Sequence, residues 1–214
     1  LFGYAHVPWV AKRQKLIEEA ALPGDLDRYI LATNAAKRFE EAGLIGIGID
    51  HFARPGDTLA IAKENRQLRR NFQGYTADRC QTLIGLGASS ISRFPSGYVQ
   101  NAAATAAYIQ RIESGIFPGA RGFEFTQTDR LHARAIEALM CEFALDLNEM
   151  AKDLGPSAES LAPYLDAITT RFAPFVREVG QRLEITAEGR PLTRMIASVL
   201  DLHVPEGVRY SRAS

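Results

Sequence analysis

The chain has 214 residues, of which 46% are hydrophobic and 23% charged, and its 25 basic residues balance its 25 acidic ones. Such a chain can form one large or two small globular domains, and its zero net charge disfavours a nucleic-acid-binding protein. No apolar run approaches the ~18 residues of a transmembrane helix, and no signal-peptide pattern opens the chain, so we expect no membrane partner. The two cysteines cannot form a disulfide framework, which favours the reducing cytoplasm.

The first part of the chain alternates apolar runs with helical patterns. Residues 1–9 are predicted to form a buried strand, and because this run opens the chain we expect a fragment of a longer protein. A polar helix is expected over 11–21. A second helix is predicted from the N-cap candidate Asp25 to Ala42, followed by Gly43, which can adopt the positive φ of a helix C-terminus. A strand over 44–50 would then complete a βαβ unit with parallel strands.

The pattern changes along the chain from mixed to mostly helical. A helix over 57–68 and a short strand over 83–87 are expected first. The helices predicted after them span residues 101–114, 126–143, 147–154 and 161–179, followed by a hairpin-like segment from 183 and a helix to about 202. The fold class is therefore α/β over 1–95, followed by a mostly helical domain over 96–214 whose hairpin beside helices suggests a winged-helix arrangement.

The segment 48–55, Gly-Ile-Asp-His-Phe-Ala-Arg-Pro, combines an acid, an imidazole and a guanidinium. It follows a predicted strand, and α/β proteins collect their ligands at the carboxyl ends of strands. His51 and Arg54 are therefore candidate binding residues. In the alternative interpretation, Asp50 caps a turn, His51 packs against its neighbours and Arg54 is solvated.

The segment 69–75, Arg-Arg-Asn-Phe-Gln-Gly-Tyr, suits a polyanionic, flat ligand. Arginine pairs with carboxylates through two hydrogen bonds, so Arg70 is a candidate anchor. Phe72 and Tyr75 could cover a ring, and Gly74 lets the backbone approach it closely. The alternative is a surface turn with solvated arginines.

A third candidate segment spans residues 85–93, Gly-Leu-Gly-Ala-Ser-Ser-Ile-Ser-Arg. Glycines after an apolar strand could admit a nucleoside or a phosphate, although many strand ends carry glycine only for turning. Arg93 joins Arg54 and Arg70 as a candidate carboxylate anchor. We predict no metal site, because the histidines and cysteines lack metal-ligand spacing. Cys141 is expected to be a buried core thiol.

Four segments in register carry a resemblance to a known family. They begin at Phe2 (Phe-Gly-Tyr-Ala-His-Val-Pro), Ile49 (Ile-Asp-His-Phe-Ala-Arg-Pro), Asn71 (Asn-Phe-Gln-Gly-Tyr-Thr) and Gly85 (Gly-Leu-Gly-Ala-Ser-Ser-Ile-Ser). In order and spacing they are similar to the oxygen-independent coproporphyrinogen III oxidases. The resemblance covers nearly all of the chain and weakens after about residue 146.

The resemblance implies a radical S-adenosylmethionine enzyme of haem synthesis. Such enzymes decarboxylate two propionates of coproporphyrinogen III to vinyl groups without oxygen, and they use a [4Fe–4S] cluster, two S-adenosylmethionine molecules and an electron donor such as a flavodoxin-type reductant. The family's C-x-x-x-C-x-x-C motif is absent here, so we expect the cluster on a missing N-terminal half. That half would supply most of a (β/α) barrel whose final strands lie in this chain, and the chain alone should be inactive.

Individual positions follow from the same resemblance. Ala5, Phe72 and Gln73 are expected to contact the second S-adenosylmethionine, and Ile91 to contact the first. From charge alone, we add Arg54, Arg70, Arg93 and His51 as substrate-binding residues.

Two functions from other classes stay open at this point. One is a tetrapyrrole-binding module or haem chaperone without oxidase activity. The other is a winged-helix nucleic-acid module, which the neutral charge disfavours. We expect a cytoplasmic monomer.

Overall fold

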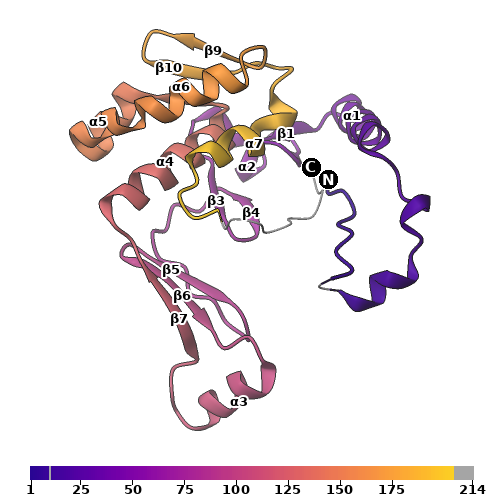
Figure 1. Cartoon of the computed structure of the whole chain (residues 1–214), viewed down its shortest axis with the longest axis vertical. Helices are drawn as coiled ribbons and strands as arrows, with labels where there is room; N and C mark the ends of the chain where they lie inside the picture. Colours follow the sequence, from indigo (N-terminus) through magenta and orange to yellow (C-terminus); the bar gives the residue numbers. More distant parts are fainter. Residues whose placement is uncertain (10, 205–214) are drawn as a thin grey trace.

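The computed structural model describes residues 1–9 and 11–204, and its elements fall into four groups (Figure 1). An extended N-terminal segment leads into a long helix. Two β-hairpins with a short helix between them lie in the middle. A three-stranded sheet projects away as an arm, and a compact helical unit with a small sheet completes the described chain. Mixed helices and strands are therefore confirmed.

The predicted strand over residues 1–9 is wrong. The segment forms no strand, and its apolar side chains are exposed, with 72% of Phe2 accessible to solvent. An extended segment becomes a strand only when the backbone of a neighbouring segment pairs with its amides. Here the segment makes isolated hydrogen bonds instead, such as that from the Leu1 amino group to the Asp50 carbonyl (2.6 Å). The polar helix expected after it is two short 3₁₀ helices, η1 (Lys12–Leu16) and η2 (Glu19–Ala21).

The next helix is confirmed as α1 (Asp25–Glu41). Its N-cap is Gly24 rather than Asp25, and the amide of Gly24 donates to the carboxylate of Asp27 (3.3 Å). Gly43 adopts a φ of 81° just beyond the helix, as the sequence predicts.

The parallel βαβ unit is also wrong, because β1 (Ile45–Ile47) turns back at once. It pairs antiparallel with β2 (His51–Ala53), so that Ile45 lies opposite Ala53 and Ile47 opposite His51. A three-residue turn that starts at Gly48, with a φ of 59°, makes this reversal possible. Helix α2 (Thr58–Glu64), capped by the Asp57 side chain, leads to a second hairpin, β3 (Arg69–Asn71) with β4 (Gly74–Thr76).

The strand expected over 83–87 does not form, apart from a single bridge between Leu83 and Arg93. Side chains replace a strand partner there: Asn101 donates to the carbonyls of Gly85 (3.0 Å) and Gly87 (2.9 Å), and the Ser92 hydroxyl accepts from the Gly85 amide. The segment is thus held as a loop against the following sheet.

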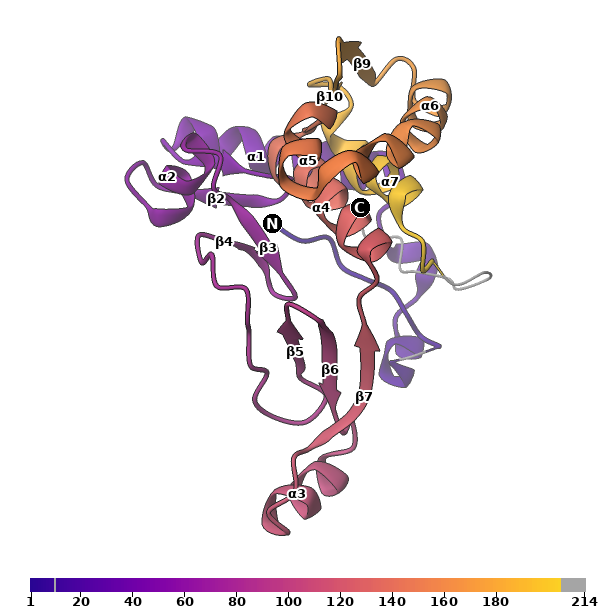
Figure 2. The same cartoon turned by 90° about the vertical axis from the view of Figure 1, so that its left-hand side faces the viewer.

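That sheet is the arm, with the strand order β5-β6-β7 and antiparallel pairing throughout. Its elements are β5 (Ile91–Phe94), β6 (Gly97–Asn101), helix α3 (Thr105–Glu113) and β7 (Gly119–Glu124). Both views show the arm extending away from the rest of the chain with α3 at its far end (Figures 1 and 2). The domain boundary near residue 95 stays a prediction; this residue lies in the turn between β5 and β6.

The C-terminal unit holds most of the buried apolar residues. Its core includes Leu131, Leu139, Leu161, Ile168 and Ile196, each at most 1% exposed. The predicted helix over 161–179 ends at residue 171, and a hairpin follows it. The elements are α4 (Gln127–Glu142), β8 (Ala144–Asp146), α5 (Leu147–Leu154), η3 (Gly155–Leu161), α6 (Ala162–Arg171), β9 (Val176–Val179), β10 (Arg182–Ile185), η4 (Arg190–Leu192), α7 (Thr193–Ala197) and η5 (Ser198–Leu200), with the sheet order β8-β10-β9.

Helix α4 joins this unit to the hairpins. A second apolar cluster includes Ile47, Leu68, Tyr75 and Cys141, and the last of these lies on α4. Cys141 is buried, as predicted, and burial raises the pKa of its thiol to about 12, so the thiol stays protonated at neutral pH. The hairpins therefore pack directly on the helical unit.

The capping box of α4 makes the unfolding free energy depend on pH in the acidic range. Asp129 accepts from the Thr126 hydroxyl (2.6 Å), from His203 (2.7 Å) and from the Thr126 amide (2.8 Å), and these bonds lower its pKa to about 2. Because the folded state binds this proton less readily than the unfolded state, the stabilisation is present above about pH 4 and is lost as the pH falls towards 2.

We expect Asp129→Asn to flatten the dependence of the unfolding free energy on pH between about 4 and 2. Asp166→Asn is the control, because Asp166 is exposed and its carboxylate accepts no hydrogen bond in the described chain. Urea unfolding at a series of pH values measures both. If the unfolding free energy of the two variants changed equally with pH, the hydrogen bonds of Asp129 would not be the cause of the acid dependence.

None of the helices in the described residues is long and apolar enough to cross a membrane.

Candidate functional site

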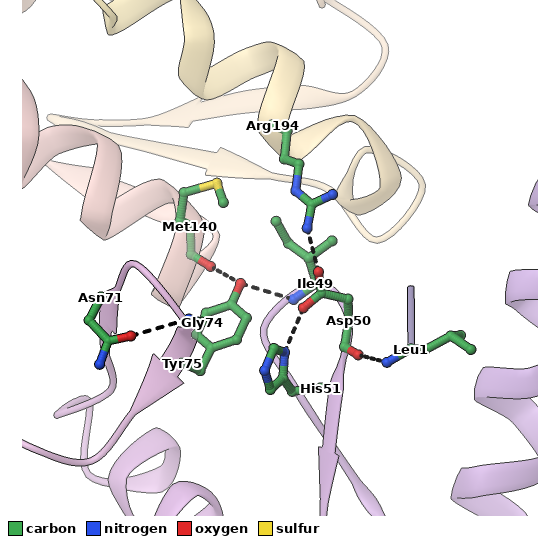
Figure 3. A network of polar contacts seen from close by, with 9 residues as sticks. All are labelled: Leu1, Ile49, Asp50, His51, Asn71, Gly74, Tyr75, Met140 and Arg194. Carbon is green, nitrogen blue, oxygen red and sulfur yellow. Dashed lines mark hydrogen bonds and ion pairs between the residues drawn. The ribbon is translucent and has the colours of Figure 1, made fainter. Parts of the chain in front are cut away.

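The turn between β1 and β2 rests on the ring of Tyr75. A Cβ atom on Gly48 would lie 2.0 Å from Cζ of that ring, so only glycine fits. The Tyr75 hydroxyl accepts from the amide of Ile49 (3.0 Å) and donates to the carbonyl of Met140 (2.8 Å) (Figure 3). One buried hydroxyl thus ties the turn, the second hairpin and α4 together.

Asp50 is the polar centre of the turn and is 9% exposed. One carboxylate oxygen contacts Nδ1 of His51 at 2.6 Å, and the other forms an ion pair with Arg194 of α7 (Figure 3). An ionised carboxylate only accepts hydrogen bonds, so Nδ1 must carry a proton. Asp50 therefore fixes how the imidazole is oriented.

The ring of His51 packs on three sides. Tyr75 and Phe2 meet it edge to face, with ring centroids 5.1 and 5.8 Å away. Gly74 lies against Nε2, because a Cβ atom there would be 2.8 Å from that nitrogen. The side chain still keeps 24% of its surface exposed, so a ligand can reach part of the ring.

Arg70 lies on the same aromatic ring. It stands opposite Tyr75 in the β3–β4 hairpin, and its guanidinium carbon is 4.4 Å from the ring centroid. Its Nη1 is buried and has no hydrogen-bond partner within the described chain. Burial raises the pKa of Tyr75, and the amide of Ile49 and the charge of Arg70 only partly oppose this rise. A buried guanidinium nitrogen without a partner is unusual in a folded protein, and it keeps Arg70 as a candidate anchor.

A second group of predicted residues gathers on one face of the arm. Arg93 pairs with Tyr98 across β5 and β6, and Ile91, two positions away, shares its face. Phe72 reaches this face from the tip of the β3–β4 hairpin, with its ring centroid 5.3 Å from that of Tyr98. Phe125 packs on the same tyrosine at 4.7 Å. The predicted positions Phe72, Ile91 and Arg93 thus surround one aromatic surface.

The other predicted positions stand apart. The carbonyl of Ala5 accepts from the side chain of Gln14 (3.1 Å), Gln73 is exposed in the β3–β4 turn, and Arg54 is exposed after β2. No hydrogen bond or ion pair within residues 1–9 and 11–204 joins these side chains to either group. Arg194 carries no signal in the sequence, because it lies 144 positions from Asp50 and belongs to no polar motif.

No family model matches the chain. An oxygen-independent coproporphyrinogen III oxidase from Cereibacter sphaeroides is 56% identical over 216 residues, which cover 100% of this chain and 48% of the relative. A relative of the same name from Paracoccus denitrificans is 53% identical over 94% of this chain and 45% of its own length. The chain is homologous to the oxygen-independent coproporphyrinogen III oxidases. It spans about half the length of the curated relatives it matches.

A solved structure agrees with these relatives. The coproporphyrinogen III oxidase HemN from Escherichia coli, described as a radical SAM enzyme, matches with a TM-score of 0.86 and 31% identity. The match covers 94% of this chain and 47% of that protein. The family resemblance found in the sequence motifs is therefore confirmed.

Proposed function

We propose that this chain is the C-terminal part of an oxygen-independent coproporphyrinogen III oxidase, which decarboxylates two propionates of its substrate in haem synthesis. The observation that carries this proposal is the 56% identity to such an oxidase over the whole chain. The fold match to a radical SAM enzyme supports the same reaction class. The tetrapyrrole-binding alternative has no observation in its favour.

The cofactors of the reaction would be held jointly with the rest of the protein. The residues described here do not fit an iron–sulfur cluster: Cys80 is exposed, Cys141 is buried, and no group of three metal-binding side chains occurs among them. We therefore assign the [4Fe–4S] cluster to the other half. For two S-adenosylmethionine molecules, we propose contacts from Ala5, Phe72 and Gln73 to one and from Ile91 to the other, on the strength of the family resemblance.

The substrate is flat and carries four carboxylates, and both groups of residues suit it chemically. Arg70 carries a buried guanidinium nitrogen without a partner in the described chain, and 24% of the His51 side chain is exposed. Arg93 lies beside the aromatic surface of the arm, where a ring could stack. Arg54 is exposed and free of ion pairs in the described chain, so it could pair with a further carboxylate.

Two finer features of the architecture belong to the same proposal. The chain would adjoin the end of a (β/α) barrel supplied by the rest of the protein, and the strands of that barrel would cover the exposed side chains of Leu1, Phe2 and Tyr4. We propose a winged-helix arrangement for the C-terminal unit, which the element order α4-β8-α5-α6-β9-β10 and the sheet order β8-β10-β9 support. We propose that this unit covers the active site and does not bind nucleic acid. We further propose a cytoplasmic monomer supplied with electrons by a flavodoxin-type reductant.

Arg70→Gln should weaken the binding of coproporphyrin III, a stable analogue of the substrate, about tenfold, because one charge-assisted bond to a carboxylate is lost. Arg38→Gln is the control, since it removes the same charge from the exposed end of α1. Fluorescence titration of the complete protein measures both affinities. Equal affinities in the two variants would show that Arg70 does not bind the substrate.

Complementation tests the proposed function in a cell. The complete gene is introduced into a bacterium that lacks its own coproporphyrinogen oxidases and therefore needs added haem. We expect growth without haem in the absence of oxygen. A strain that makes the intact protein but still requires haem and excretes coproporphyrin would contradict the proposal.

A further inference from the structure

Two parts of the chain that are far apart in sequence meet at the carboxylate of Asp50. One oxygen faces Nδ1 of His51, its neighbour in the chain, and the other faces Nη2 of Arg194 (Figure 3). The Asp50 side chain is only 11% exposed, whereas 40% of the Arg194 side chain is accessible. A nearly buried carboxylate with both oxygens occupied has little freedom to rotate.

Arg194 is held by a firmly packed element. Its neighbours Thr193 and Ile196 are fully buried, and the Thr193 hydroxyl donates to the carbonyl of Arg190 (2.7 Å). Ile49, just before Asp50, packs against the core of the same C-terminal unit. The position of the guanidinium is therefore set by the unit as a whole and not by local chain geometry.

The consequence falls on His51. Free neutral imidazole of histidine favours the proton on Nε2, but a carboxylate at Nδ1 reverses this preference because it can only accept. Nε2 is then an acceptor when the ring is neutral. If Asp50 were free to turn away, the ring would lose both its orientation and its defined tautomer.

We propose that Arg194 is a positioning residue for His51. Through Asp50, it holds the imidazole in the Nδ1-protonated form and in one orientation, so that the C-terminal unit determines how a residue of the proposed substrate site meets its ligand. The identity of that ligand rests on the proposed function. The chain of contacts from Arg194 through Asp50 to His51 is independent of it.

The test is nuclear magnetic resonance of the complete protein with ¹⁵N-labelled histidine, recorded with the rings neutral. His51→Gln identifies the signal of His51. We expect the Nδ1-protonated tautomer in the unmodified protein and a fall in its ratio to the other tautomer, on the order of tenfold, in Arg194→Gln. Arg194→Lys should recover part of the ratio, because it keeps a cation near Asp50.

The matched control is Arg177→Gln, which breaks an ion pair with Glu184 in the same C-terminal unit without touching Asp50. It should leave the His51 signal unchanged. If Arg194→Gln fails to fold, Arg194→Lys takes its place and should lower the ratio by a smaller amount. An Nε2-protonated His51 in the unmodified protein, or an unchanged ratio in Arg194→Gln, would overturn the proposal. Because this readout needs neither cofactor nor turnover, it stands or falls separately from the oxidase activity.

Discussion

Gly48→Ala is expected to lower the free energy of unfolding by about 3 kcal/mol or more. The new methyl group would lie 2.0 Å from Cζ and 2.2 Å from the hydroxyl oxygen of Tyr75, so the ring or the turn must move. Either movement breaks the bonds of that hydroxyl to Ile49 and Met140. A positive φ of 59° adds the ordinary cost of a left-handed residue. Urea unfolding of the complete protein measures the loss.

Gly43→Ala separates the two causes. Gly43 also has a positive φ, 81°, but no atom lies within 4 Å of a Cβ placed there. It should therefore cost only the backbone term, about 1 kcal/mol. A similar loss in both variants would show that the contact with Tyr75 is unimportant.

Tyr75→Phe is expected to cost about 2 kcal/mol, because it leaves a partly buried amide and a buried carbonyl without partners. The same variant should change the dependence of stability on pH. Burial raises the pKa of Tyr75, so the unfolded chain releases this proton at a lower pH than the folded protein. The stabilisation is complete below about pH 10 and is lost as the pH rises through the folded value. The phenylalanine variant should lose less stability over that range.

Tyr164→Phe is the matched control for the hydroxyl. Its ring is partly buried and packs against His132 at 4.7 Å, but its hydroxyl makes no hydrogen bond among the described residues. It should change the unfolding free energy by less than about 0.5 kcal/mol. If both variants cost the same, the bonds to Ile49 and Met140 do not stabilise the turn.

Helices α1, α4 and α5 could be predicted because their signals are local. Helix α4 begins where the sequence predicts, with a capping box of Thr126 and Asp129, and α5 spans the predicted residues 147–154. Gly43 ends α1 as its lack of a side chain predicts. Each of these features depends on residues within one or two turns of each other, which a sequence displays directly.

The strands were predicted less well because an apolar run does not indicate which other segment it will pair with. Residues 1–9 have the composition of a strand but find no partner within the described chain. Residues 44–50 do contain a strand, yet its direction of pairing was decided by the turn at Gly48. The hydroxyl of Ser92 and the amide of Asn101 hold the segment after Leu83 as a loop, and their reach could not be foreseen from spacing.

The candidate site shows the same division. The sequence identified Asp50, His51 and Arg70, whose residue types are unusual together, and the structure places all three around Tyr75 or beside it. It gave no sign of Arg194, because that contact depends on how the C-terminal unit packs on the hairpins. Which of these residues touch a ligand stays a prediction.

The most direct test of the central claim is anaerobic turnover by the complete protein with its cluster assembled, given coproporphyrinogen III, S-adenosylmethionine and a reductant. Mass spectrometry follows the tetrapyrrole and 5′-deoxyadenosine together. We predict a tetrapyrrole that has lost two carboxyl groups, formed in step with 5′-deoxyadenosine. A tetrapyrrole that binds but keeps all four carboxylates, with the cluster verified, would contradict the oxidase and leave a binding module in its place.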